Sequence, residues 1–166
     1  MDRRQFITTS LSTLTGAALL GPAALHPIAG AAPATQGKTM RRRAIPATGE
    51  KLPVVGLGTW QTFDPEPINE QTLKPLRDVL EQLRKLGGTV VDSSPMYGDS
   101  ERVVGRLASE LEINDALFFA TKVWTRGEAQ GIAQMKQSLK RLQREKLELM
   151  QVHNLVDWQT HLPVLK

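Results

Sequence analysis

The 166-residue sequence contains no cysteine, which removes several classes of function at once. Without a thiol, the chain can form no disulfide, no thiolate metal site and no cysteine nucleophile. Histidine is also scarce: of three in the chain, His26 lies near the start and His161 near the end. We therefore expect no metal site. The lack of cysteine does not fix the compartment, because an exported protein can also lack it.

Aromatic residues are rare as well, at 5% of the sequence, and Tyr97 is the single tyrosine. The net charge is +4, and the densest basic cluster, Arg41 to Arg43, has no aromatic residues between its arginines. Binding to nucleic acid calls for a basic stripe with such aromatics, so we expect no nucleic-acid partner and interpret the cluster as solvated. The chain also lacks the GxxxxGK[ST] phosphate loop. Its lone Gly-x-Gly, at residues 56–58, lacks the further glycine of a dinucleotide-binding loop.

No apolar run approaches the roughly 20 residues that a stable membrane span needs. The start of the chain, MDRRQFI, instead pairs Arg3 with Arg4 ahead of a weakly apolar stretch. This pattern resembles a twin-arginine export signal, and Ala32 and Ala34 flank a proline as in an A-x-A cleavage site. The alternative is a buried N-terminal helix, but the prolines and glycines of this segment disfavour it because both residues break helices.

This segmentation predicts three parts. We expect an export signal peptide at residues 1–34, a linker at 35–39 and the folded part at 40–166. The predicted destination is the bacterial periplasm.

From Met40 onward, short apolar runs alternate with helical patterns. Residues 41–55 predict a small β-hairpin. Leucines recur at helical spacing between residues 73 and 83, and Gly87 and Gly88 follow as a helix end. We expect two more helices, one capped by Ser100 and one opened by a capping box of Thr125 and Glu128.

The strands between these helices, in TVVD, LFFATKVW and LELMQVHN, are continuous apolar runs. Such runs are typical of strands buried on both faces. Strands that alternate with helices indicate an α/β fold with a parallel sheet.

Within these stretches, TVVD, FFATK and LMQVH each end in an ionisable residue. These residues are Asp92, Lys122 and His153, which are 30 and 31 residues apart. Each has an ordinary explanation on its own, as a turn residue, a solvated lysine or a structural histidine. The carboxyl ends of parallel strands meet at one edge of the sheet, however, and that edge is where ligands bind in α/β folds. The repeated spacing therefore predicts a functional site.

Tyr97, five residues after Asp92, suggests the chemistry of this site. A phenol is a weak acid at neutral pH, and a nearby ammonium such as that of Lys122 would favour its ionised form. Asp92 could hold Lys122 in place, and His153 could orient a carbonyl oxygen. The set suits protonation of a carbonyl oxygen while a hydride reaches the carbon. No side chain supplies a hydride, so a cofactor is required.

The stretches VVGLGTW, VVDSSPMYGDSERVVG, FFATKVW and LELMQVHN resemble the aldo-keto reductase family, in the right order between residues 54 and 154. The Asp-x4-Tyr motif followed by Gly-x-Ser-Glu is the most specific part. The resemblance implies a (β/α)8 TIM barrel with an N-terminal hairpin. It also implies NADPH-dependent reduction of a small-molecule aldehyde or ketone.

The same resemblance implies roles for individual residues. Tyr97 would be the proton donor, Asp92 and Lys122 its tuning pair, and His153 the group that orients the substrate. The residues implied to contact the cofactor are Gly58, Thr59, Trp60, Asp92 and Asn154.

The sequence departs from the family in length, because it predicts about four βα units whereas a whole barrel needs about 250 residues. We therefore expect the N-terminal half of such a barrel, as a fragment or a truncated product, without the phosphate-binding motifs of the other half. Two alternatives stay open. One is a non-catalytic half-barrel remnant or assembly module, and the other is a different TIM-barrel enzyme that uses Asp92 and His153 as acid and base. The sequence leaves the oligomeric state open.

Overall fold

The computed structural model describes residues 40–165. The predicted export signal and linker lie outside these residues. The described part begins with the predicted hairpin, in which β1 (Arg42–Ala44) and β2 (Lys51–Pro53) pair antiparallel. Gly49 adopts a φ of 74° in the connecting turn, a conformation that suits glycine. The hairpin prediction is therefore confirmed.

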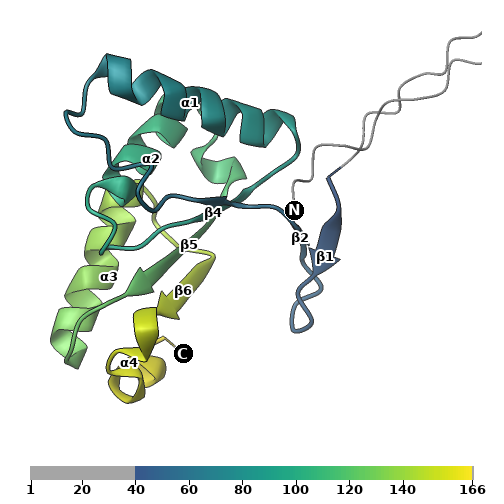
Figure 1. Cartoon of the computed structure of the whole chain (residues 1–166). Helices are drawn as coiled ribbons and strands as arrows, with labels where there is room; N and C mark the ends of the chain where they lie inside the picture. Colours follow the sequence, from purple (N-terminus) through teal and green to yellow (C-terminus); the bar gives the residue numbers. More distant parts are fainter. Residues whose placement is uncertain (1–39, 166) are drawn as a thin grey trace, which may run out of the picture. The chain divides into compact units, whose positions relative to one another are not determined.

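A parallel sheet follows the hairpin (Figure 1). Its strands pair in chain order as β3 (Leu57–Gly58), β4 (Val90–Asp92), β5 (Phe118–Val123) and β6 (Leu149–Val152). The elements between and after them are α1 (Glu70–Lys85), α2 (Ser100–Glu110), η1 (Asn114–Ala116), α3 (Glu128–Leu142), η2 (His153–Leu155) and α4 (Trp158–Val164). This confirms the predicted α/β class with a parallel sheet. Within residues 40–165 the sheet is open, with β3 and β6 at its edges.

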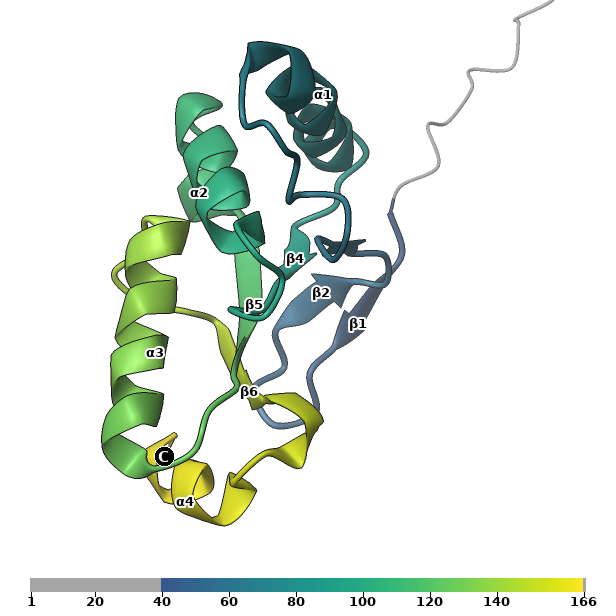
Figure 2. The same cartoon turned by 60° about the vertical axis from the view of Figure 1, so that its left-hand side comes forward.

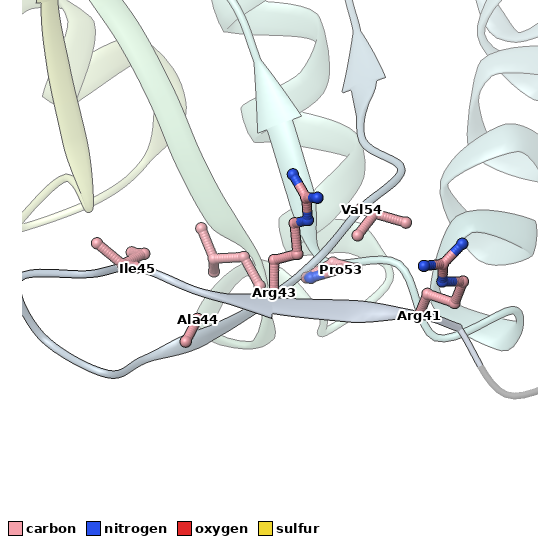
Figure 3. Close-up of a pocket in the computed structure, with 7 residues that line it drawn as sticks. Arg41, Arg43, Ala44, Ile45, Pro53 and Val54 are labelled. Carbon is pink, nitrogen blue, oxygen red and sulfur yellow. The ribbon is translucent and has the colours of Figure 1, made fainter.

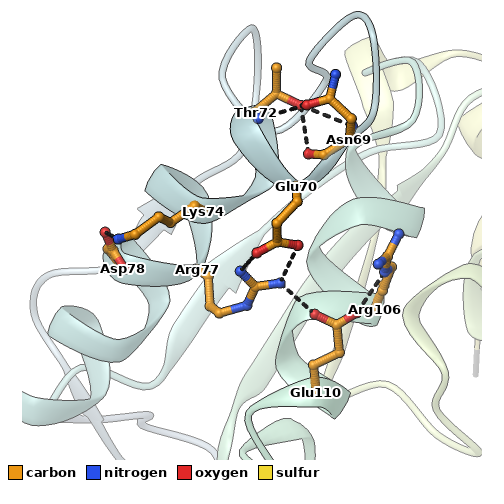
Figure 4. A network of polar contacts seen from close by, with 8 residues as sticks. All are labelled: Asn69, Glu70, Thr72, Lys74, Arg77, Asp78, Arg106 and Glu110. Atoms are coloured by element: carbon orange, nitrogen blue, oxygen red, sulfur yellow. Dashed lines mark hydrogen bonds and ion pairs between the residues drawn. The ribbon is translucent and has the colours of Figure 1, made fainter.

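Helix α1 begins at a reciprocal cap. The backbone N–H of Thr72 donates to the Asn69 side chain, and the backbone N–H of Asn69 donates to the Thr72 hydroxyl, each at 3.1 Å (Figure 4). The helix ends before Gly87, which has a φ of 85°, as the sequence predicted. On its outer side, Arg77 joins α1 to α2 through an ion pair with Glu110 at 2.8 Å.

The two other predicted helix starts differ from the structure. Helix α2 begins at Ser100, but Asp99 occupies the cap position, and the Ser100 hydroxyl donates to the carbonyl of Thr59. Helix α3 begins at Glu128 after Gly127, so the predicted capping box is wrong. The N–H of Gly127 instead donates to a carboxyl oxygen of Asp157, 30 residues further along the chain. At α3, a contact between residues far apart in the sequence thus bonds the backbone N–H of the cap residue.

The core lies between the sheet and helices α1 to α3, which stand side by side in Figure 2. Val91 of β4 and Phe119 of β5 are fully buried in it, together with Leu80 and Leu107 from the helices. Helix α2 approaches α3 so closely that a Cβ added to Gly105 would lie 2.6 Å from the Cα of Leu142. No helix in the described part of the chain is long and apolar enough to cross a membrane.

Candidate active site

Two of the predicted site residues are joined directly. The Lys122 ammonium donates to a carboxyl oxygen of Asp92 at 2.7 Å and to the carbonyl of Ser93 at 2.7 Å. Strands β4 and β5 pair in parallel, with Asp92 beside Ala120, so Lys122 lies just beyond the end of β4 and reaches back to it. The Lys122 side chain is only 12% exposed, which strengthens its electrostatic contacts. The predicted contact between these two residues is confirmed.

Tyr97 and His153 complete the cluster. The Lys122 ammonium lies 5.2 Å from the centroid of the Tyr97 ring. The His153 ring meets the Tyr97 ring edge-on, with centroids 5.8 Å apart. A tight turn aims Tyr97 at this place, because its N–H donates to the carbonyl of Ser94 and Gly98 follows with a φ of 57°. The structure therefore brings the four predicted catalytic side chains together, and their catalytic roles stay predictions.

A buried carboxylate braces the strand that carries Lys122. Glu101 of α2 is fully buried and accepts a hydrogen bond from the Thr121 hydroxyl at 2.6 Å. Its other oxygen lies 3.6 Å from the guanidinium of Arg141 on α3. Because Thr121 precedes Lys122, this bond fixes β5 next to the ammonium.

The residues predicted to contact a cofactor occupy different positions. Gly58 pairs with Asp92, and the Thr59 hydroxyl is buried in a 2.9 Å hydrogen bond to Ser93, so it is already used within the protein. Trp60 is 61% exposed, and its ring centroid lies 6.2 Å from that of Tyr97. Asn154 directly follows His153, in the left-handed region with a φ of 53°. Trp60 is thus the one of these four whose side chain the structure places against the catalytic cluster.

Two neighbours of the site were not predicted from the sequence. The hydroxyl of Ser94 lies 2.8 Å from Nδ1 of His153, and the Trp124 ring centroid lies 6.2 Å from that of the same histidine. The sequence contained a signal for Trp124, because this tryptophan closely follows β5 as Trp60 closely follows β3. Ser94 lies inside the Asp-x4-Tyr motif, but nothing in the sequence indicated that its side chain would contact His153.

The surroundings of His153 favour its neutral form. Burial lowers the pKa of His153 below its ordinary value of 6.5, and the positive charge of Lys122 lowers it further, against a smaller opposite effect of Asp92. At neutral pH the imidazole is therefore uncharged, and one of its nitrogens carries a proton that it can donate.

This electrostatic arrangement makes Lys122→Met informative. Removing the ammonium should raise the pKa of His153, since it removes a repulsive charge and leaves the attraction of Asp92. The change can be followed by proton NMR of the imidazole. Lys146→Met, which removes an exposed lysine from the loop before β6, is the matched control and should leave this pKa unchanged. A fall of the His153 pKa in Lys122→Met would contradict the arrangement.

The same pKa has a consequence for stability. Folding lowers the pKa of His153, so the unfolded chain binds a proton more readily than the folded chain. The free energy of unfolding therefore falls as the pH drops below 6.5 and through the lowered pKa of the folded state. Above that pH, the contribution of His153 is fully present. The fall should be smaller in Lys122→Met, and urea unfolding on both sides of pH 6.5 measures it.

Other surface features of the described residues lie apart from this cluster. A hollow of about 470 Å³ is formed by the hairpin and the residues beside it (Figure 3), and none of the four catalytic candidates lines it. Its basic members are Arg41 and Arg43. Among residues 40–165, no group of three histidine, aspartate or glutamate side chains is arranged to hold a metal ion.

Comparison with known proteins identifies the family. The sequence profile of the Aldo/keto reductase family matches residues 54–165. The chain is 31% identical over 129 residues to the aldo-keto reductase YhdN of Bacillus subtilis, covering 69% of this chain and 38% of that protein. It is 32% identical over 119 residues to the methylglyoxal reductase YeaE of Escherichia coli, covering 69% of this chain and 40% of the relative.

Comparison with solved structures points to the same family. The crystal structure of an aldo-keto reductase from Klebsiella pneumoniae in complex with NADPH matches with a TM-score of 0.56 and 27% identity. That match covers 69% of this chain and 40% of the other. The chain spans about two fifths of the length of the curated relatives it matches, and the matched part includes all four clustered side chains. The chain belongs to the aldo/keto reductase family.

Proposed function

We propose that this chain supplies the proton-transfer part of the active site of an NADPH-dependent carbonyl reductase. The observation that carries the proposal is the arrangement of Lys122, which is bonded to Asp92 and lies against the face of the Tyr97 ring. A cation held there, with a neutral histidine beside the phenol, suits the protonation of a carbonyl oxygen.

In this mechanism each residue has one task. The Tyr97 phenol donates its proton to the carbonyl oxygen, and Lys122 stabilises the phenolate that remains. Asp92 keeps Lys122 in place, while His153 donates a hydrogen bond that orients the carbonyl. NADPH, when bound, supplies the hydride that reduces the carbonyl carbon, so that an aldehyde or ketone becomes an alcohol and the cofactor becomes NADP⁺.

Trp60 and Asn154 are the residues that would contact the nicotinamide end of the cofactor. Trp60 presents an exposed ring beside Tyr97, and Asn154 follows His153 at the same strand edge. Relatives support the choice of cofactor, because the sorbitol-6-phosphate dehydrogenase of Malus domestica is named as NADP-dependent and the Klebsiella structure contains NADPH.

The isolated 166-residue chain should bind NADPH weakly or not at all. The physical reason is that its sequence holds no phosphate-binding loop and matches only about two fifths of its relatives. Titration of the purified chain with NADPH, followed by the fluorescence of its three tryptophans and of the cofactor, measures this. The aldo-keto reductase from Klebsiella pneumoniae, whose crystal structure contains NADPH, serves as the positive control. A micromolar dissociation constant for the chain would contradict the expectation.

Activity is best tested in a barrel whose second half comes from a relative. Residues 40–165 can be joined to the C-terminal part of YhdN, and NADPH consumption followed with a small reactive aldehyde. Methylglyoxal is a suitable substrate, because YeaE of Escherichia coli is named a methylglyoxal reductase. We expect consumption of NADPH that depends on the carbonyl, with the alcohol as product. A folded barrel that binds NADPH but reduces no carbonyl would contradict the proposal.

A non-catalytic role as an assembly module is the second candidate. It is favoured by the open edge of the sheet, where Leu149 of β6 is 42% exposed. Light scattering of the purified chain distinguishes the two, because an assembly module should form a stable complex at micromolar concentration without NADPH.

We also propose that the chain is exported through the twin-arginine route, on the strength of Arg3 and Arg4 in the MDRRQFI segment. That route carries folded proteins, so a cofactor could be loaded before export. Replacing both arginines with lysine should retain the protein in the cytoplasm, and periplasmic fractionation measures this. Unchanged export of the double variant would refute the proposal.

A further inference from the structure

Two adjacent serines beside the catalytic cluster have different partners. Ser93 and Ser94 are both fully buried. The Ser93 hydroxyl accepts a hydrogen bond from the Thr59 hydroxyl at 2.9 Å. The Ser94 hydroxyl oxygen lies 2.8 Å from Nδ1 of His153 and accepts a hydrogen bond from the backbone N–H of Met96 at 3.3 Å. Only Ser94 is therefore in a position to act on the histidine.

The direction of the bond between Ser94 and His153 follows from counting donors and acceptors. A hydroxyl has one hydrogen to donate, and its oxygen can accept. The N–H of Met96 already donates to the oxygen of Ser94. If Nδ1 of His153 also donated to it, the hydroxyl hydrogen would be left without an acceptor in a fully buried position, which proteins avoid. If the hydroxyl donates to Nδ1, then the N–H of Met96, the hydroxyl of Ser94 and Nδ1 of His153 all have partners.

We propose that Ser94 is a positioning residue that fixes the protonation of the His153 ring. Its hydroxyl, oriented by the N–H of Met96, donates to Nδ1 and thereby holds the neutral imidazole in the tautomer with its proton on Nε2. The rings of Tyr97 and Trp124 flank the imidazole and hold it in place. Ser94 determines which of its two nitrogens carries the proton.

The consequence for chemistry rests on the proposed function. A neutral His153 with the proton on Nε2 offers a hydrogen-bond donor to a carbonyl oxygen. The other tautomer would offer a lone pair at that nitrogen, which repels the same oxygen. The lowered pKa of His153 agrees with this, because only the neutral ring has a tautomer to choose.

The test reads the tautomer directly. The full chain is labelled with ¹⁵N-histidine, and long-range ¹H–¹⁵N spectra are recorded above the titration range of His153. The chain has three histidines, so His26→Gln and His161→Gln assign the signals. The unaltered chain should show Nε2 of His153 protonated and Nδ1 as an acceptor, in a single tautomer. Ser94→Ala should give a mixture of tautomers, seen as nitrogen shifts that move toward each other.

Ser93→Ala is the matched control, since it removes the neighbouring buried hydroxyl and leaves the bond to His153 intact. It should keep the single tautomer. A proton on Nδ1 in the unaltered chain, or the same single tautomer in Ser94→Ala, would overturn the proposal. If Ser94→Ala fails to fold, the spectrum of the unaltered chain still decides the direction of the bond. Because the readout needs neither NADPH nor a carbonyl, it is independent of whether the proposed reduction occurs.

Discussion

Tyr97→Phe should lower carbonyl reduction by about 100- to 10,000-fold, the range that a single general acid contributes. The experiment uses the barrel completed with the second half of YhdN, in which NADPH and methylglyoxal are varied separately. The phenylalanine keeps the ring that lies against the Lys122 ammonium and removes only the acidic proton. Binding of NADPH should therefore be unchanged, because the phenol acts on the carbonyl and not on the cofactor phosphates.

Two comparisons make this result specific to the phenol. Lys146→Met, which alters an exposed loop, should retain full activity in the same barrel. A fluorescence titration with NADPH should give the same affinity for Tyr97→Phe as for the unaltered barrel. Equal activity of Tyr97→Phe on a reactive aldehyde would refute the assignment of Tyr97 as the proton donor.

Gly105→Ala should reduce the free energy of unfolding by about 3 kcal/mol or more, at the upper end of what overpacking costs. A Cβ at this position would lie 2.6 Å from the Cα of Leu142 and closer still to the carbonyl oxygen of Arg141. Both are backbone atoms in the last turn of α3, so the clash cannot be relieved by rotating a side chain. Helix α2 would have to move away from α3. Urea unfolding, monitored by circular dichroism, measures the change.

Gly58→Ala is the matched control for stability, because a Cβ added there meets no atom within 4 Å. It should change the free energy of unfolding by less than about 1 kcal/mol. If the two variants were destabilised equally, the close packing of α2 on α3 would not be the cause.

Much of the fold could be predicted because its signals are local. The continuous apolar runs around Val91 and Phe119 are typical of buried strands, and the leucines of α1 recur with the period of an amphipathic helix. The meeting of Asp92 with Lys122 followed from the parallel order of the strands. Once each strand ends in an ionisable residue, the topology places these residues at one edge.

The contacts that escaped prediction join residues far apart in the sequence. Gly127 is held by Asp157 of the segment before α4, so the local pattern of Thr125 and Glu128 gave the wrong helix start. Ser94 and His153 are 59 residues apart, and their bond depends on how the turn after β4 meets the end of β6. No periodicity or propensity carries such information, because it arises only when the strands are packed.

The proposed function requires the cluster around Tyr97 to direct the transfer of a hydride from NADPH to a carbonyl carbon. The most direct measurement supplies the completed barrel with NADPH deuterated at the transferring position of the nicotinamide, and analyses the alcohol formed from methylglyoxal by mass spectrometry and NMR. We expect a single deuterium on the former carbonyl carbon of the alcohol. An alcohol without deuterium, or no alcohol from a folded barrel saturated with NADPH, would contradict it.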